Sequence, residues 1–330
     1  MIYLNRALII IITLFLFGCT HNSGEKKEEK IQQLRFNGQG TFRIAQFTDI
    51  HWDPSSENNT KNLETIRMVL AAEQPDLIIL TGDIVTAGPA AKGWADLARP
   101  LSESGIPWTV TLGNHDDEAD MSREQIFDLL TGLPGFAGTK GPDISGTGNY
   151  VLQVLHHTSE QPAALIWCFD SHGYPSQKEH GDYDWIKHDQ IQWYRNLSAE
   201  YTAKNNQQAL PALAYFHIPL PEYKEVALQE DKTGRFEEKV CSPDINSGLF
   251  AAFLERGDVM GMFVGHDHVN NYIGNHLGIA LGYGQHTGID TYGEFPKGAR
   301  IVELREGSRA FTTWIRTGEG KMDLYNFNAL

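Results

Sequence analysis

The chain has 330 residues, of which 41% are hydrophobic, so it is long enough for one large domain or two small ones with a sizeable core. Its 42 acidic residues outnumber its 27 Lys and Arg residues, which gives a formal charge of −15. Proteins that coat nucleic acids gather Lys and Arg against the phosphates, so this charge argues against that class and fits a protein that binds cations.

The first 19 residues are predicted to be a signal peptide that is not part of the fold. After Arg6, an apolar run through residue 17 has the length of a signal peptide rather than of a membrane span. It ends in Leu16-Phe17-Gly18-Cys19, which resembles the cleavage box of bacterial lipoproteins, in which the cysteine is lipidated. We therefore expect an exported protein held at a membrane, periplasmic or at the cell surface, by lipid on Cys19. A plain signal peptide and an uncleaved anchor are the alternatives.

The segment that follows is rich in Lys and Glu between residues 21 and 33, which is typical of a solvated tether. We assign residues 20–40 to this tether and residues 41–330 to one folded domain. No composition shift marks a second boundary within the domain.

Strands and helices alternate in the first part of the domain. A strand is predicted over residues 42–48, an amphipathic helix over 60–73, and a continuous apolar strand, typical of a sheet buried on both faces, over 76–81. A second helix is predicted over 90–104, interrupted or kinked at Pro100, and leads to a short strand over 106–111.

The second part of the domain continues this alternation and then turns mainly to strands. Ser122-Arg123-Glu124-Gln125 fits a capping box that begins a helix. The remaining expectations are loops over 132–148 and 220–246, helices over 184–201 and 247–255, and strands over 149–155, 164–169, 212–216, 259–264, 299–304 and 310–316.

Polar residues of metal-ligand type follow five of these strands. Asp49 and His51 point to the same side of an extended chain, because side chains alternate with period two. Carboxyl ends of strands are where α/β sheets place their chemistry, and mixed carboxylates and imidazoles bind transition metals. The blocks, in chain order, are Asp49-x-His51, Gly82-Asp83, Gly113-Asn114-His115-Asp116, His217 and Gly265-His266-x-His268.

These five blocks, in this order, resemble the signature of the calcineurin-like metallophosphoesterases, with a match from about residue 42 to residue 268. The resemblance implies an α/β fold, a four-layer α/β/β/α sandwich, with two metal ions at the strand ends. It implies that Asp83 bridges the two ions. The remaining ligands would be Asp49, His51 and His268 for one ion, and Asn114, His217 and His266 for the other.

The resemblance also assigns the catalytic residues. His115 matches the histidine that protonates the leaving oxygen or stabilises the charge on it, and Asp116 is expected to orient His115. A pair of cations would hold a bridging hydroxide and neutralise the charge that protects a phosphoester from attack. Because the ligands mix Asp, Asn and His, we expect Mn, Fe or Zn rather than Ca.

The C-terminal blocks are similar to purple-acid-phosphatase-like proteins, but two positions depart from the purple enzymes. Those enzymes carry a tyrosine ligand three residues after the bridging aspartate, where this chain has Thr86, and a glycine where this chain has His51. Without a tyrosinate to give charge transfer, we expect a colourless or faintly coloured protein.

Other polar residues have simpler interpretations. Contiguous Asp170-Ser171-His172 is not expected to form a nucleophilic triad, because triads are assembled in space. Cys168 reads as a core thiol, and no spacing requires it to pair with Cys241. His172 or His286 is a weaker candidate for contact with substrate, and the aromatic residues Trp185, Trp193 and Tyr194 are expected to pack a helix. Five histidines are interpreted as ordinary loop residues: His156, His157, His180, His188 and His276.

The function expected from these residues is hydrolysis of a phosphomonoester. One alternative is a phosphodiesterase that acts on nucleotides or phospholipid head groups with the same metals. An alternative of another class is a non-catalytic surface lipoprotein that binds a ligand in the same fold. Protein partners and oligomeric state are not predicted.

Overall fold

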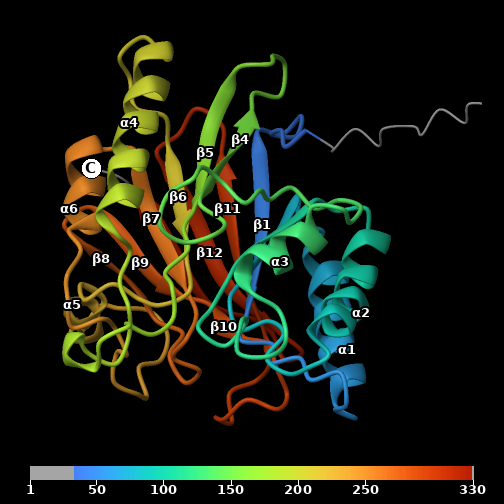
Figure 1. Cartoon of the computed structure of the whole chain (residues 1–330). Coiled ribbons are helices and arrows are strands. Elements are labelled where there is room, and N and C mark those ends of the chain that lie inside the picture. Colours follow the sequence, from blue (N-terminus) through green and yellow to red (C-terminus); the bar gives the residue numbers. More distant parts are fainter. Residues whose placement is uncertain (1–32, 329–330) are drawn as a thin grey trace, which may run out of the picture. The chain divides into compact units, whose positions relative to one another are not determined.

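The computed structural model describes residues 33–328 and contains two β-sheets with helices outside them (Figure 1). The predicted signal peptide and most of the predicted tether lie outside the described residues. None of the helices in the described part combines the length and hydrophobicity that a membrane span requires.

The first sheet has seven strands in the order β13-β12-β11-β1-β2-β3, with β10 also paired to β1. Strands β1, β2 and β3 are parallel, and β11 joins β1 in antiparallel register. The three parallel strands therefore end at the same edge of the sheet. The bounds are β1 Thr41–Thr48, β2 Leu77–Thr81, β3 Trp108–Thr111, β10 Gln285–His286, β11 Gly298–Arg305, β12 Ala310–Thr317 and β13 Gly320–Asn328.

The second sheet has six strands in the order β4-β5-β6-β7-β9-β8. Its four inner strands are parallel, and β4 and β8 are antiparallel strands at its edges. The bounds are β4 Tyr150–Leu155, β5 Pro162–Cys168, β6 Ala212–Tyr215, β7 Val259–Val264, β8 Ile273–His276 and β9 Ile279–Tyr283.

Helices cover the outer face of each sheet, which gives the four layers α/β/β/α (Figure 1). The first sheet carries α1 Asn59–Glu73, α2 Ala90–Glu103 and α3 Arg123–Leu130. The second sheet carries α4 His188–Lys204, α5 Tyr223–Ala227 and α6 Leu249–Arg256. The capping box predicted at Ser122 is present, with Ser122 and Gln125 each accepting a hydrogen bond from the other's backbone N–H.

Two cores hold these layers together, and single strands contribute to both. In β6, Leu213 and Tyr215 face the core between the sheets, whereas Ala212 and Ala214 face the core under α4 and α6. This alternation follows from the period of two in a strand. Because both faces are covered, all residues of β2 and of β7 are buried, as their continuous apolar sequences predicted.

Some elements differ from the expectations. Helix α2 continues through Pro100 without interruption. The proline removes one backbone hydrogen bond, but the burial of Trp94, Leu97 and Leu101 on the inner side of the helix offsets this loss. The helix expected from residue 184 begins at His188, so Trp185 does not pack a helix; instead its ring lies 3.5 Å from the ammonium of Lys187. The predicted loop over 220–246 contains α5, and strands β8, β9, β10 and β13 had not been assigned individually.

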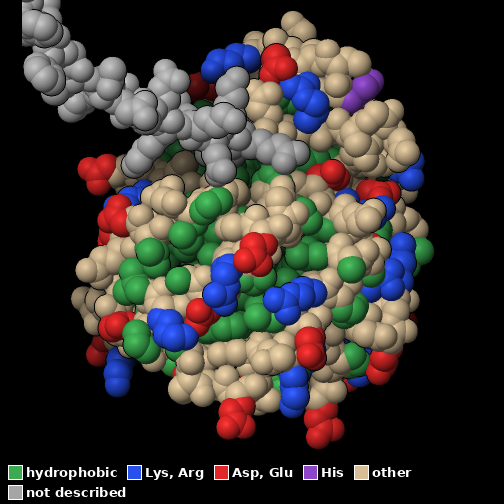
Figure 2. Space-filling view, turned by 90° about the vertical axis from the view of Figure 1, so that its right-hand side faces the viewer, with side chains coloured by type: hydrophobic (Ala, Val, Ile, Leu, Met, Phe, Trp, Pro, Cys, Tyr) green, Lys and Arg blue, Asp and Glu red, His purple; other side chains and the backbone are tan. Residues whose placement is uncertain are grey.

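Figure 2 shows the face of the molecule that carries α1 and α2, with hydrophobic side chains between scattered charges of both signs. Basic side chains on this face are not gathered into a stripe.

Candidate metal centre

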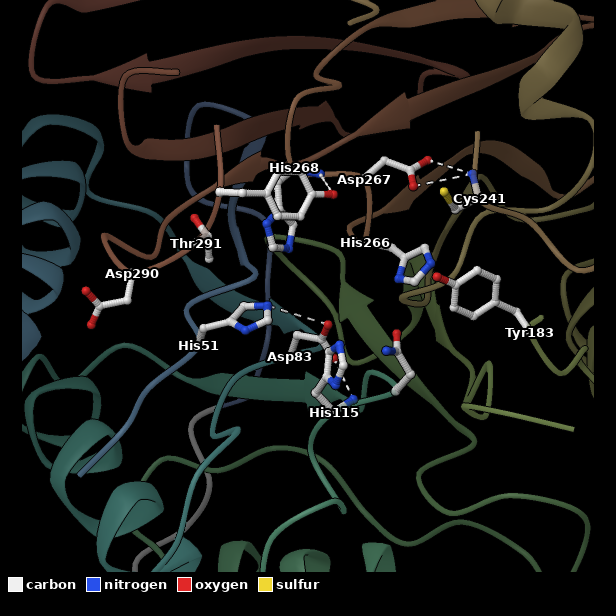
Figure 3. A pocket seen from close by; sticks show the side chains of 12 residues that line it. His51, Asp83, His115, Tyr183, Cys241, His266, Asp267, His268, Asp290 and Thr291 are labelled. Carbon is white, nitrogen blue, oxygen red and sulfur yellow. Dashed lines mark hydrogen bonds and ion pairs between the residues drawn. The ribbon is translucent and has the colours of Figure 1, made fainter. Parts of the chain in front are cut away.

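The predicted ligand residues follow strands of both sheets. Asp49 and His51 come after β1, Asp83 after β2 and Asn114 after β3; His217 comes after β6, and His266 and His268 come after β7. The parallel strands of each sheet end at one edge. Figure 3 shows His51, Asp83, His266 and His268 around one cavity, which Asn114 also lines, and Asp49 and His217 lie within ligand distance of these residues. The chain thus brings together all seven candidate ligands.

Six of these residues form two groups of potential metal ligands. Within each group, the ligand atoms lie within 4.8 Å of one another. The Oδ2 atom of Asp83 lies 3.2 Å from Nε2 of His217 and 3.6 Å from Nε2 of His51, so this carboxylate stands between the groups. The groups are Asp49, His51 and His268, and Asp83, His217 and His266.

Several buried polar atoms at this centre have no hydrogen-bond partner within residues 33–328. Buried polar atoms are normally paired, because leaving one unpaired costs about 1–3 kcal/mol. A cluster of such atoms from nitrogen and oxygen ligands is what a transition-metal site requires, so the residues fit Mn, Fe or Zn. The unpaired atoms are Nε2 of His51, His217 and His266, Nδ1 of His268, and Oδ1 of Asn114.

Two of these ligand atoms are aimed by hydrogen bonds on the other side of the same side chain. The Nδ1 atom of His217 donates to the carbonyl oxygen of Thr81 at 2.8 Å, so Nε2 is the nitrogen that faces Asp83 and would bind a metal ion. The Nδ2 atom of Asn114 donates to the hydroxyl of Tyr174 at 3.0 Å, which turns Oδ1 toward the centre.

The ligands approach one another closely because glycines precede them. A Cβ atom on Gly82 would lie 2.3 Å from Nδ1 of His217, and one on Gly113 would lie 2.2 Å from Oδ1 of Asp83. Side chains at either position would displace a candidate ligand. The glycines of the Gly82-Asp83 and Gly113-Asn114 blocks therefore make room for the site.

Four candidate ligands have left-handed backbone conformations. Their φ angles are 51° for Asp49, 48° for His51, 52° for Asp83 and 80° for His266. Residues other than glycine rarely adopt positive φ, and such conformations cluster at functional sites. Each of these residues lies at the point where a strand ends and the chain turns, so the turn directs its side chain into the centre.

The carboxylates and imidazoles of the centre strongly affect one another's pKa. Burial would raise the pKa of Asp49, but the imidazole of His268 outweighs it and lowers the pKa to about 2. Burial would likewise lower the pKa of His217, but Asp83 raises it to about 9. The pKa of Asp83 itself is below its usual value, because His217 and His51 outweigh its burial. A proton on His217 thus balances Asp83, and a bound cation would release it.

His115 lies at the edge of the centre, and its partner differs from the expectation. Its Nδ1 atom is 2.6 Å from Oε2 of Glu118, and its backbone N–H donates to Oδ1 of Asp83. Burial lowers the pKa of His115, but Asp83 and Glu118 raise it by more than burial lowers it. The pKa of His115 therefore lies above its usual value.

The prediction that Asp116 orients His115 is wrong. The Asp116 carboxylate accepts hydrogen bonds from backbone N–H groups of the two adjoining loops, because the tight turn directs it beneath the residue 83–85 backbone. Burial and the charge of Asp83 outweigh these hydrogen bonds and raise its pKa to about 6. Asp116 therefore fixes the loop that carries Asp83, and its donors are Asp83, Ile84, Val85 and Gly113 at 2.7–3.0 Å.

A cavity of about 270 Å³ opens above the candidate ligands (Figure 3). Tyr183 meets the ring of His266 edge-on at 4.5 Å between centroids, and Tyr292 stacks on His268 at 4.2 Å. The sequence interpretation missed these tyrosines, since they come from irregular loops without a periodic pattern. No Lys or Arg occurs among the described residues that line this cavity.

The other polar candidates have structural partners. Asp170 pairs with Arg123, and Ser171 accepts a hydrogen bond from the backbone of Ile218, so the Asp170-Ser171-His172 stretch forms no triad. His172 contacts Gln190, and His286 lies behind His268 and contacts Lys297; neither lines the cavity.

Cys168 and Cys241 are both free thiols. Burial raises the pKa of each to about 12, so neither is a reactive thiolate. Thr86 lies outside the cavity and donates its backbone N–H to the carbonyl of Trp52.

A two-sheet sandwich with paired carboxylate and histidine groups at its strand ends defines a class of metal-dependent phosphoesterases. The chain belongs to the calcineurin-like phosphoesterase family, whose sequence profile matches residues 42–270. The family uses a dinuclear metal centre, and the two groups of ligands described above are the candidates for it.

Relatives of this chain are purple-acid-phosphatase-like. Two proteins of Arabidopsis thaliana, named probable inactive purple acid phosphatase 29 and 14, are 33% and 32% identical to it. The alignments cover 91% and 86% of this chain and 88% and 80% of those proteins.

Among solved structures, a dimetal phosphatase from Danio rerio superposes with a TM-score of 0.62 at 11% identity, covering 88% of this chain and 99% of that one. The purple acid phosphatase PPD1 of yellow lupin, Lupinus luteus, superposes with a TM-score of 0.53 at 15% identity, covering 89% and 55%. At these identities the structures support the fold.

Proposed function

We propose that the chain is a dinuclear-metal-dependent phosphatase that hydrolyses a phosphomonoester. The observation that most supports this proposal is the position of the Asp83 carboxylate between two ligand groups, with His115, a potential acid, beside it. Asp49, His51 and His268 would hold one ion, Asn114, His217 and His266 the other, and Asp83 would bridge them.

The two cations would act as Lewis acids on the phosphate and would lower the pKa of water that attacks it. His115 would supply the proton that the leaving oxygen needs. Glu118 holds Nδ1 of His115, so Nε2 is the atom that faces the substrate. Asp83 and Glu118 raise the pKa of His115 above its usual value despite burial, so the imidazole holds this proton more firmly than a free histidine does.

The word "inactive" in the names of the two Arabidopsis relatives makes catalysis the point to test. The complete ligand set and the presence of His115 support turnover over the alternative of a non-catalytic binding protein. Phosphate release from a panel of phosphomonoesters, with protein loaded separately with Mn, Fe and Zn, tests the proposal. A metal-loaded protein that hydrolyses no phosphoester would overturn it.

The second candidate reaction is hydrolysis of a phosphodiester by the same residues. The small cavity above the ligands, about 270 Å³, favours a monoester, since a diester must place two organic groups around one phosphorus. Rates for nitrophenyl phosphate and bis-nitrophenyl phosphate, measured on one preparation, separate the two reactions. A higher kcat/KM for the diester would favour the phosphodiesterase.

We further propose that the protein is exported and anchored by lipid on Cys19. The support is the apolar run that ends in Leu16-Phe17-Gly18-Cys19, within the part of the chain that the structure does not describe. Labelled palmitate should enter the full-length protein in a bacterial host and should be absent from the Cys19→Ser variant. Equal labelling of the two proteins would contradict the anchor.

A further inference from the structure

A second cavity, of about 540 Å³, adjoins the cavity above the candidate ligands. The two cavities share two lining residues, Tyr183 and Cys241, and therefore lie next to each other. We call the second cavity the side groove. Nothing in the ligand set or in the role of His115 explains why a groove twice as large opens from the site.

The position of His115 indicates where the organic part of a substrate would lie. On the proposed function, the ester oxygen that leaves must be close to His115. The ring of Tyr174 lies 6.4 Å from that of His115 between centroids, and Tyr174 stacks on Tyr183 at 6.1 Å with 27° between the planes. A row of rings thus leads from the acid to the mouth of the side groove.

The side groove has a mixed lining, with exposed apolar side chains beside charged ones and no net formal charge. Phe236 and Leu228 are 38% and 78% exposed, which is unusual for large hydrophobic side chains, and Ala227 and Val240 line the groove beside them. Two lysines, Lys224 and Lys239, are matched in number by Asp182 and Asp244. An apolar group that lies along Phe236 and Leu228 would remove their hydrophobic surface from water, and an uncharged group would meet no net charge in the groove.

The cavity above the ligands sets a second condition. Its described lining contains Asp83, Asp267 and Asp290 but no Lys or Arg. With no basic side chain there to bind further anionic groups, the negative charge of a substrate should be confined to the phosphate that reacts. Nucleoside triphosphates and sugar bisphosphates do not meet this condition.

We propose that the side groove is the subsite for the alcohol part of the substrate, and that this part is an aromatic alcohol with an uncharged apolar extension. This inference rests on the proposed function and names its substrate class. The aromatic ring next to the ester oxygen would lie against Tyr174 and Tyr183, and the extension would fill the groove along Phe236 and Leu228. Water would add across the P–O bond to give the free alcohol and inorganic phosphate.

The test compares phenyl phosphate with 4-biphenylyl phosphate on the metal-loaded full chain, because their leaving phenols have similar acidity. We expect kcat/KM to be about tenfold higher for the biphenylyl ester, the size of effect that one added apolar group has in a pocket. The Phe236→Ser variant should reduce this ratio to near one. Leu254, on α6, is equally exposed at 39% and lines neither cavity, so Leu254→Ser should keep the wild-type ratio.

A binding measurement separates failure of this inference from failure of the proposed function. Phenylphosphonate and 4-biphenylylphosphonate are not hydrolysed, and their affinities can be measured by calorimetry. Hydrolysis of both esters with equal kcat/KM would overturn the side groove as a subsite and leave the phosphatase intact. A second outcome is that neither ester is hydrolysed, that the biphenylyl phosphonate binds more tightly than phenylphosphonate, and that Phe236→Ser removes this difference. This outcome would support the groove as a subsite and overturn the catalytic proposal. Equal binding of the two phosphonates together with no hydrolysis would overturn both.

Discussion

His217 donates its Nδ1 hydrogen to the main-chain carbonyl of Thr81 at 2.8 Å, a bond that joins the second sheet to the last residue of β2. The ring of His217 lies directly over Gly82, where φ is +81°. Nε2 of His217 can therefore point at Asp83 only because Gly82 has no side chain.

We predict that Gly82→Ala will reduce metal affinity by roughly 10–100-fold, the range seen when the groups that orient a ligand are disturbed. The added Cβ would displace His217, and metal content after dialysis measures the loss. Gly105→Ala is the matched control, since Gly105 also has a positive φ, +71°, but faces open space. Equal metal loss in both variants would show that backbone strain, rather than the position of His217, is responsible.

His115→Ala should keep both metal ions and lower kcat by roughly 10²–10⁴-fold, since it removes an acid without removing a ligand. Asp83→Asn should lose metal and turnover together, because Asp83 lies between the two ligand groups. Metal analysis beside activity assays checks both variants. The assignment fails if the two variants lose metal to the same extent.

Arg123 and Asp170 form a buried pair that supports the loop after β3. Arg123 donates to the Asp170 carboxylate at 2.8 Å and to the carbonyl of Gly113 at 2.6 Å. Arg123→Met should lower the free energy of unfolding by about 3–5 kcal/mol, because it leaves the Asp170 charge buried and unpaired. The double variant, Arg123→Met with Asp170→Asn, should lose less free energy of unfolding than Arg123→Met alone, as measured by urea unfolding. If the two single substitutions prove additive, the two residues are not coupled.

Asp258 is expected to make stability depend on pH. Burial raises the pKa of its carboxyl above 3.8, although Tyr194 donates a hydrogen bond to it. As the pH rises, the unfolded chain loses this proton first, so the contribution of Asp258 to stability is complete below pH 3.8 and declines as the pH passes the folded-state pKa.

Asp258→Asn should therefore gain stability relative to the wild type as the pH rises above 3.8, the usual pKa of the carboxyl, as followed by thermal unfolding. Asp128→Asn, at a side chain that is 67% exposed, is the control. A constant difference between wild type and Asp258→Asn across this range would contradict the prediction.

Much of the ligand set was predictable because it follows from strand ends. Asp49, Asp83 and His266 each come directly after an apolar run, or one glycine beyond it, and parallel strands bring such ends to one edge. What brings the two sheet edges together is packing between distant strands, and the resemblance to a known family supplied that part.

The partners of His115 and the walls of the cavity were not predictable in the same way. Asp116 is adjacent to His115 in the chain, but the turn after β3 directs its carboxylate to the backbone of residues 83–85, and Glu118 contacts the imidazole instead. Tyr174, Tyr183 and Tyr292 come from loops whose conformations depend on tertiary contacts, so no local pattern identifies them.

Each group of candidate ligands draws on both sheets: Asp49 and His51 join His268, and Asp83 joins His217 and His266. On the proposed function, the ions would then act as cross-links between the first and last thirds of the domain. Neither part alone could retain them, and excess metal would raise the unfolding temperature of the whole domain by mass action. During synthesis, the metal ions could bind only after β7 has left the ribosome and packed into the second sheet. Metal binding would therefore be a late step in folding.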